Sequence, residues 1–221
     1  MGGEVFLNDK RVGHLEEQQQ LGGDSATQYP AKMLLSILTK FMTDEGRRRH
    51  VSRFFDDKQI RIFDKQLNEK YNCPMTSSCG RVLDAASVLL GFCEKREYDG
   101  SPAIELENNS AEAYEIEPAI KKDVLLTSLL FRYLILNMNK DKKRLAGTVQ
   151  KYIVDGLYRI CVDHAKGLPI VFTGGCAVNE KMRKFLAEKG VLFNSEISCG
   201  DQGIAWGQVV YFSRNSNAIG R

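Results

Sequence analysis

Alternation of hydrophobic and polar positions opens the chain and predicts a β-hairpin over 4–15, where EVFLNDKRVGHL alternates around a turn-forming Asn-Asp pair. A loop with Gly, Ser and Pro follows to residue 30. Apolar residues then recur at helical spacing, and Gly91 suits the C-cap of the last helix in this run. The predicted helices cover about 30–43, 56–71 and 78–90.

The second half begins with two strongly apolar segments, 123–140 and 148–167, which predict packed core helices. The spacing of the apolar residues then changes and no longer fits a helix. LPIVFTGG predicts a buried strand that ends in two glycines, and the order strand, Gly-Gly, helix, strand, Gly-rich turn, helix is typical of α/β domains. These last elements are predicted over 168–175, 179–189, 191–194 and 200–212.

The pattern as a whole predicts one α/β domain over 1–221. We expect a hairpin and loop over 1–30, a mainly helical part over 30–165 and an α/β part over 166–221. The length of 221 residues and the 43% of hydrophobic residues suit one large domain with a real core.

Charge and targeting signals narrow the class of partner. A net charge of +3 is too small to indicate nucleic-acid binding. The chain has no apolar run of the roughly 18 residues that a membrane span needs, and its first residues lack a signal-peptide pattern. We therefore expect a cytoplasmic protein that binds neither nucleic acid nor a membrane.

The six cysteines show no metal-binding spacing, because none forms a CxxC pair. A structural zinc site is not expected, and neither are disulfides in a reducing compartment. Cys176 lies directly after Gly175, where a catalytic nucleophile and a small buried thiol are both conceivable; the second interpretation is favoured.

The first candidate site is IVFTGGCAVN, over 170–179. Gly174 and Gly175 place backbone without side chains at the carboxyl end of a strand, where open α/β sheets bind ligands, and the amides of the following helix favour anions. A tight turn without a ligand is the alternative. Asn179, one turn later, can bond a nucleotide base or cap the helix.

The second candidate site is SCGDQGIAWGQ, over 198–208. Asp201 stands in a glycine-flanked turn before an apolar helix, so it is either an N-cap or a carboxylate close to a metal or phosphate. In the second case Gly200 and Gly203 would leave space for substrate.

The third candidate site is TSSCGRVLDAASVLLG, over 76–91. Asp84 stands among apolar residues of a helix and needs a partner, because burying an unpaired carboxylate is costly. Gly80, one turn earlier on the same face, would open space for a ribose whose hydroxyls Asp84 could accept.

These three strings, together with YDGSPAIELE and the N-terminal GGEVFLNDKRVGHL, resemble the C-terminal domain of HypF-type hydrogenase-maturation carbamoyltransferases in order and spacing. The resemblance implies an RNase H-like lobe of an actin-like ATPase (ASKHA) fold with extra helices, partial relative to the two-lobed domain. It also implies an enzyme that uses ATP to convert carbamoyl phosphate into a carbamoyl-adenylate. The carbamoyl group then passes to the C-terminal cysteine of a HypE-like partner.

Residue by residue, the resemblance assigns Gly174, Gly175 and Asn179 to nucleotide binding and Gly80 with Asp84 to the ribose. Asp201 would be the catalytic, metal-binding aspartate, for Mg, Fe or Zn. Less specific positions that line or brace the cleft would be Ser77, Ser78, Glu105 and Gly203.

This sequence also departs from the family's pattern. The upstream domains, the D-G-T motif and the paired metal-binding histidines are absent, and Cys79 and Cys176 replace other small or apolar residues. We therefore expect the chain to be incomplete alone, with a separate polypeptide supplying the rest. A non-catalytic scaffold and a relative of the tRNA threonylcarbamoyladenosine enzymes are the alternatives.

Overall fold

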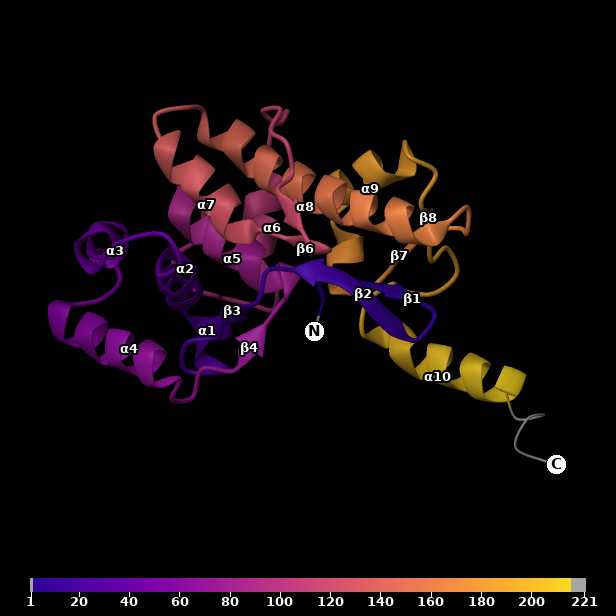
Figure 1. The fold of residues 1–221 in the computed structure, drawn as a ribbon, viewed down its shortest axis with the longest axis horizontal. Coiled ribbons are helices and arrows are strands. Elements are labelled where there is room, and N and C mark those ends of the chain that lie inside the picture. The colour runs from indigo at the N-terminus through magenta and orange to yellow at the C-terminus, as the bar shows by residue number, and fades with distance from the viewer. Residues whose placement is uncertain (1, 216–221) are drawn as a thin grey trace.

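The computed structural model describes residues 2–215 as a mixed α/β molecule (Figure 1). Its strands are β1 (Glu4–Leu7), β2 (Lys10–Leu15), β3 (Gln18–Gln19), β4 (Met75–Thr76), β5 (Ile120–Lys121), β6 (Val124–Leu125), β7 (Val171–Phe172) and β8 (Leu192–Phe193). Its helices are α1 (Ser25–Gln28), α2 (Ala31–Leu38), α3 (Asp44–Val51), α4 (Asp57–Glu69), α5 (Cys79–Leu90), α6 (Ser101–Asn108), α7 (Thr127–Leu136), α8 (Lys142–Ala165), the 3-10 helix η1 (Gly175–Val178), α9 (Glu180–Ala187) and α10 (Gln202–Asn215).

The N-terminal hairpin is confirmed: β1 and β2 pair antiparallel and form the edge of a four-stranded sheet in the order β1-β2-β6-β5. β6 joins β2 in parallel, with His14 opposite Val124. A segment far along the chain therefore completes the sheet. β7 and β8 form a separate parallel pair with α9 between them in sequence, which confirms the predicted order of these elements. The prediction of a buried strand over 168–175 is wrong in length and burial, because β7 spans only Val171–Phe172 and Leu168 and Val171 are each more than half exposed.

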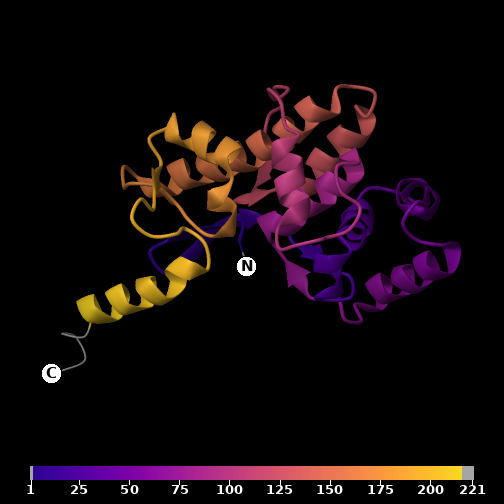
Figure 2. The ribbon, with the colours of Figure 1, turned by 180° about the vertical axis from the view of Figure 1, so that it is seen from behind.

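The core lies where α2, α5 and α8 pack together (Figures 1 and 2). α5 is buried around most of its circumference, because most of its side chains are apolar or small. Its two alanines, Ala85 and Ala86, are fully buried and allow neighbouring helices to approach. Gly91 closes α5 in the left-handed conformation, as predicted.

Two predicted helices have different beginnings. The helix predicted over 123–140 is wrong in its first turn, because Lys122 and Asp123 adopt positive φ angles of 50° and 60° and turn the chain into β6. Pairing with β2 and β5 holds residues 124–125 extended, and α7 starts only at Thr127. α8 starts before the predicted 148, because the Asp141 carboxylate accepts backbone N–H bonds from the first turn.

Three α-helices, α1, α3 and α6, were not predicted. α3 has the polar sequence DEGRRRHV, so it lacks the apolar stripe that reveals a helix. Instead, Thr43 caps it, and the nearly buried Arg47 forms an ion pair of 2.7 Å with Asp64 of α4.

Within residues 2–215, no helix is both long and apolar enough to cross a membrane.

Candidate functional site

The N-terminal glycines meet the start of α5. The backbone N–H of Cys79 donates to the Gly2 carbonyl at 3.0 Å. Gly3 has a φ of +88°, and a Cβ there would lie 2.4 Å from the Ser77 carbonyl oxygen, so only glycine fits. The Ser77 hydroxyl donates to a Glu4 carboxylate oxygen at 2.9 Å. The motifs GGE and TSSCG thus form one structural unit.

Asp84 is buried, with 1% of its side chain exposed, and Arg81 is its charged partner, with Nη2 2.6 Å from Asp84 Oδ2. The prediction that this aspartate needs a partner is confirmed. Burial raises the pKa of Asp84 to about 6, against the opposing positive charges of Arg81 and Arg96. Gly80, one turn earlier, has open space at its Cβ position, since only Ser78 Oγ lies within 4 Å, at 3.8 Å.

The Gly174-Gly175 turn is open on the side where side chains would stand. Gly174 has a φ of +93°, and neither glycine has any neighbouring atom within 4 Å of its Cβ position. The Gly174 N–H donates to the Cys199 carbonyl at 2.7 Å, which ties this turn to the start of the SCGDQG motif. Backbone hydrogen bonding therefore fixes the turn, and no protein atom fills the space on its open side.

Asn179 is the N-cap of α9. Its side-chain oxygen accepts the Met182 N–H at 2.9 Å, and the residue is buried. Of the two interpretations of Asn179, the structure shows the cap. The Oδ1 atom is engaged in that bond, so contact with a nucleotide base would fall to the amide nitrogen.

Asp201 is exposed directly before α10, and its backbone carbonyl accepts the Ile204 N–H. The expectation that Gly203 leaves space for substrate is wrong, because a Cβ there would lie 2.2 Å from the Ser198 carbonyl oxygen. Because Gly203 has no side chain, its backbone can lie close to the backbone of Ser198. Among the described residues, no group of three or more His, Cys, Asp or Glu side chains is arranged to hold a metal. The donor set of this part of the chain does not fit a divalent metal on its own.

The cleft candidates Ser78 and Glu105 lie in different surroundings. Ser78 is the N-cap position of α5 and uses no side-chain bond for the cap. Glu105 instead lines a hollow of about 410 Å³ with Phe92 and Tyr98. Nothing in the described contacts joins Glu105 to the Gly174-Gly175 turn, so the structure places it in a hollow of its own.

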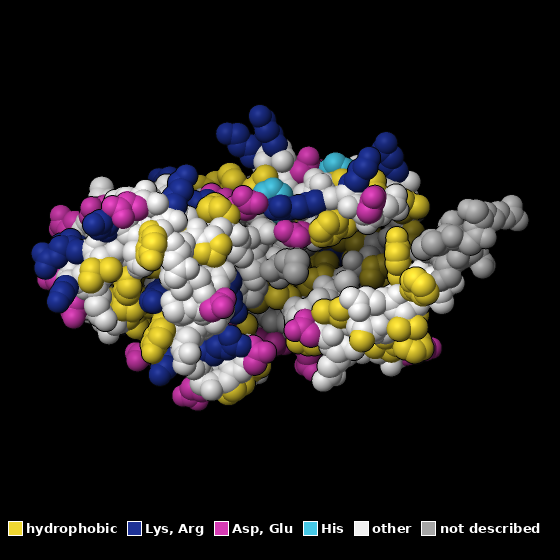
Figure 3. All heavy atoms as spheres, turned by 90° about the horizontal axis from the view of Figure 1, so that it is seen from below, with side chains coloured by type: hydrophobic (Ala, Val, Ile, Leu, Met, Phe, Trp, Pro, Cys, Tyr) yellow, Lys and Arg dark blue, Asp and Glu magenta, His cyan; other side chains and the backbone are white. Residues whose placement is uncertain are grey.

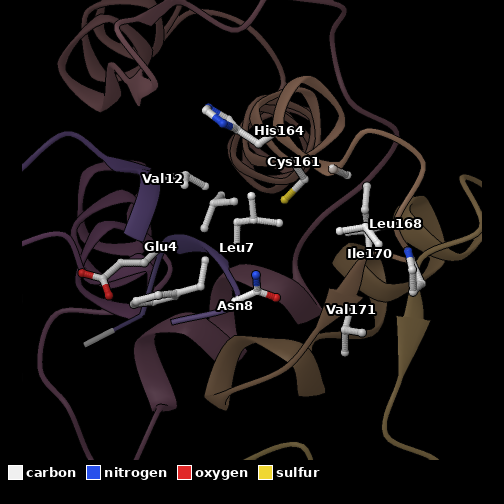
Figure 4. A pocket seen from close by; sticks show the side chains of 13 residues that line it. Glu4, Leu7, Asn8, Val12, Cys161, His164, Leu168, Ile170 and Val171 are labelled. Atoms are coloured by element: carbon white, nitrogen blue, oxygen red, sulfur yellow. The ribbon is translucent and has the colours of Figure 1, made fainter. Parts of the chain in front are cut away.

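A second hollow, which the sequence did not indicate, separates the hairpin from the C-terminal third (Figure 4). It has a volume of about 370 Å³ and is lined by residues of β1 and β2, by the end of α8, and by residues 168–171. β1 and β7 are both edge strands on either side of it. Such a hollow arises from the distance between two sheets, which no local pattern encodes.

The four glycine-containing motifs therefore converge. Cys79 and Cys176 lie within hydrogen-bonding reach of each other, which brings η1 to the first turn of α5. Backbone bonds add Gly2 on one side and Cys199 on the other. Fold and site define a mixed α/β domain whose glycine turns gather around one helix N-terminus.

The particular family follows from the comparison with known proteins. Residues 2–208 match the family described as "Carbamoyltransferase, Kae1-like Domain, second subdomain", and the chain belongs to that family. It is 41% identical to the probable carbamoyltransferase HypF of Methanocaldococcus jannaschii, over 97% of this chain and 30% of that protein. It is 29% identical to the carbamoyltransferase HypF of Rhodobacter capsulatus, over 95% of this chain and 29% of that protein.

Solved structures share the fold. HypF from T. kodakarensis superposes with a TM-score of 0.80 at 24% identity, over 91% of this chain and 29% of that chain. A full-length HypF in the phosphate- and nucleotide-bound form gives a TM-score of 0.81, also at 24% identity, over 93% of this chain and 29% of that one. The chain thus spans about three-tenths of the length of these relatives.

Proposed function

We propose that this chain is the nucleotide-binding lobe of a HypF-type carbamoyltransferase, with the actin-like ATPase (ASKHA) arrangement. Its ligands would be ATP and the carbamoyl-adenylate derived from carbamoyl phosphate. The final acceptor would be the C-terminal cysteine of a HypE-like protein, in hydrogenase maturation. Membership of the carbamoyltransferase family supports this proposal, as does a relative of the same fold that binds phosphate and nucleotide.

One observation supports the location of the nucleotide site. Gly80 on α5 and the Gly174-Gly175 turn both lack side chains, both leave open space, and the cysteines next to them are in contact. A flat or charged ligand can approach backbone closely only where no Cβ stands in the way. Asp84 lies beneath this surface with Arg81, where it would orient the arginine; direct contact with a ribose would require the carboxylate to become exposed.

The proposal includes a second polypeptide segment that completes the cleft. α10 extends away from the rest of the molecule (Figures 1 and 2), and Ile204, Trp206 and Val209 on it are each more than half exposed. The face that carries α10 is hollowed, with hydrophobic side chains on the walls (Figure 3). Apolar surface of this kind marks an interaction site. The same segment would have to supply further ligands if Asp201 is to hold a metal.

The test is nucleotide binding by Gly175→Val. The valine side chain would enter the open space that we assign to the ligand, and its Cβ would have no neighbouring protein atom within 4 Å. We expect ATP, ADP or AMP to raise the Tm of the wild-type chain, because a ligand that binds only the folded state stabilises it. Gly175→Val should lose this shift while its own Tm stays close to that of the wild type.

Gly207→Val is the matched control, since it adds the same side chain at an open position on α10, away from the turn. Equal nucleotide shifts in Gly175→Val and Gly207→Val would contradict the assigned site. Absence of any shift in the wild type at millimolar nucleotide, even with the complementary HypF segment present, would favour a non-catalytic scaffold. The lack of a complete metal donor set among residues 2–215 is the observation in favour of that second candidate.

A further inference from the structure

Two thiols meet between the motifs that form the proposed nucleotide site. Cys79 is the first residue of α5, and Cys176 is the second residue of η1. They are far apart in sequence. In the folded chain η1 packs against α5, and the two thiols lie close enough for an interaction of the Cys79 S–H with the Cys176 sulfur to shift both of their pKa values. Six free cysteines are present, all reduced.

The surroundings make the two thiols unequal. The interaction between the thiols lowers the pKa of Cys176, and the nearby Arg81 charge acts in the same direction, against burial and the Asp84 charge. The same interaction, followed by burial, raises the pKa of Cys79 well above its ordinary value. Because the thiolate is the nucleophile in thiol oxidation, Cys176 is the sulfur that reacts first and Cys79 the one that resolves it.

We propose that Cys79 and Cys176 form a redox-active pair that closes to a disulfide when the protein meets a peroxide. The Cys176 thiolate attacks one peroxide oxygen, the O–O bond breaks, and a sulfenic acid and hydroxide form; the hydroxide takes up a proton to become water. The Cys79 sulfur then attacks the Cys176 sulfur, its proton leaves with the sulfenic hydroxyl as a second water, and the S–S bond forms. Two thiols are oxidised and one peroxide is reduced to two waters.

The local structure permits the bond. A disulfide needs Cα atoms roughly 4.4–6.8 Å apart, so one side must have freedom to adjust. Cys176 follows Gly174 and Gly175, beside which the space is open, so its thiol can adjust while the Gly174–Cys199 backbone bond holds the start of the turn. The remaining thiols lack such a neighbour: Cys73 and Cys93 donate to backbone carbonyls, and Cys199 faces Arg183.

The consequence for ligands rests on the proposed function. The new bond would fix the Gly174-Gly175 turn against the first turn of α5, which carries Gly80. The open space between these glycines would then lose its ability to adapt to a nucleotide. Oxidation is therefore expected to weaken nucleotide binding reversibly, and reduction with a dithiol to restore it.

The experiment uses the full chain with hydrogen peroxide, quenched and digested without reducing agent. Mass spectrometry should find one cross-linked peptide pair containing Cys79 and Cys176, two hydrogens lighter than the separate peptides, which disappears after dithiothreitol. Cys79→Ser and Cys176→Ser should each remove the cross-link. Cys161→Ser is the matched control and should retain it, because Cys161 lies on α8 and has only burial acting on its pKa.

Two outcomes would contradict the proposal that Cys79 and Cys176 form a redox-active pair. One is that both thiols of the wild type stay free after peroxide treatment, or that Cys176 is oxidised to sulfinic acid while Cys79 stays reduced. The other is a cross-link in which either cysteine pairs with a different one. These results concern the covalent chemistry alone. A confirmed cross-link with no nucleotide shift in either redox state would instead contradict the proposed nucleotide site, so the two failures are distinguishable.

Discussion

The buried carboxylate of Asp84 makes the stability of this domain depend on pH. The perturbation is Asp84→Asn, which keeps the shape of the side chain and removes the titration. Asp84 is 1% exposed beside Arg81, and burial raises its pKa from an ordinary value of 3.8 to about 6. The folded chain therefore binds a proton at Asp84 more tightly than the unfolded chain does.

The direction and the size of this pH dependence follow from the linkage between proton binding and folding. Between pH 3.8 and about 6 the folded state carries more protons at Asp84 than the unfolded state, so the free energy of unfolding falls as pH rises. The contribution is fully present below pH 3.8 and is lost above about 6. At about 1.4 kcal/mol per pKa unit, the shift corresponds to about 3 kcal/mol.

Urea unfolding at a series of pH values measures this contribution. The free energy of unfolding of the wild type should fall relative to that of Asp84→Asn by up to about 3 kcal/mol as pH rises from about 3.5 to 7. The difference between the two proteins is the readout, because it cancels the other titrating groups. A constant difference in stability, caused by loss of the ion pair with Arg81 in Asp84→Asn, does not affect this readout, because only the change with pH is compared. Parallel pH profiles would refute the assigned burial of a raised-pKa carboxylate.

Substitutions at four further positions test other contacts. Gly156→Ala would bring its Cβ within 2.5 Å of Leu125 Cδ1 and should cost about 1–3 kcal/mol of unfolding free energy in urea. Gly207→Ala on the open face of α10 should be neutral or gain up to ~1 kcal/mol. Asn179→Ala should lose ~1 kcal/mol while Asn179→Asp keeps the cap; equal losses would contradict capping. Asp201→Asn should abolish manganese-dependent ATP binding with the complementary segment present and leave Tm unchanged; unaltered binding would remove its metal role.

Local rules in the sequence determined much of the secondary structure. Alternation identified the hairpin, helical periodicity identified α2, α4 and α5, and Gly91 marked the end of α5 because glycine adopts positive φ at little cost. The apolar surroundings of Asp84 in sequence also predicted correctly that this carboxylate would have a charged partner. Each of these features depends on residues a few positions apart, which one sequence displays directly.

Tertiary structure alone decided which of these features meet. β6 replaced the first turn of a predicted helix because the adjacent β5 and the distant β2 both pair with its backbone. The sequence predicts space for substrate at Gly203, yet the Ser198 carbonyl lies where a Cβ would stand. The contact between Cys79 and Cys176 has no local signal. Such contacts depend on how elements pack, and packing is set by the summed burial of many side chains rather than by the spacing within any one motif.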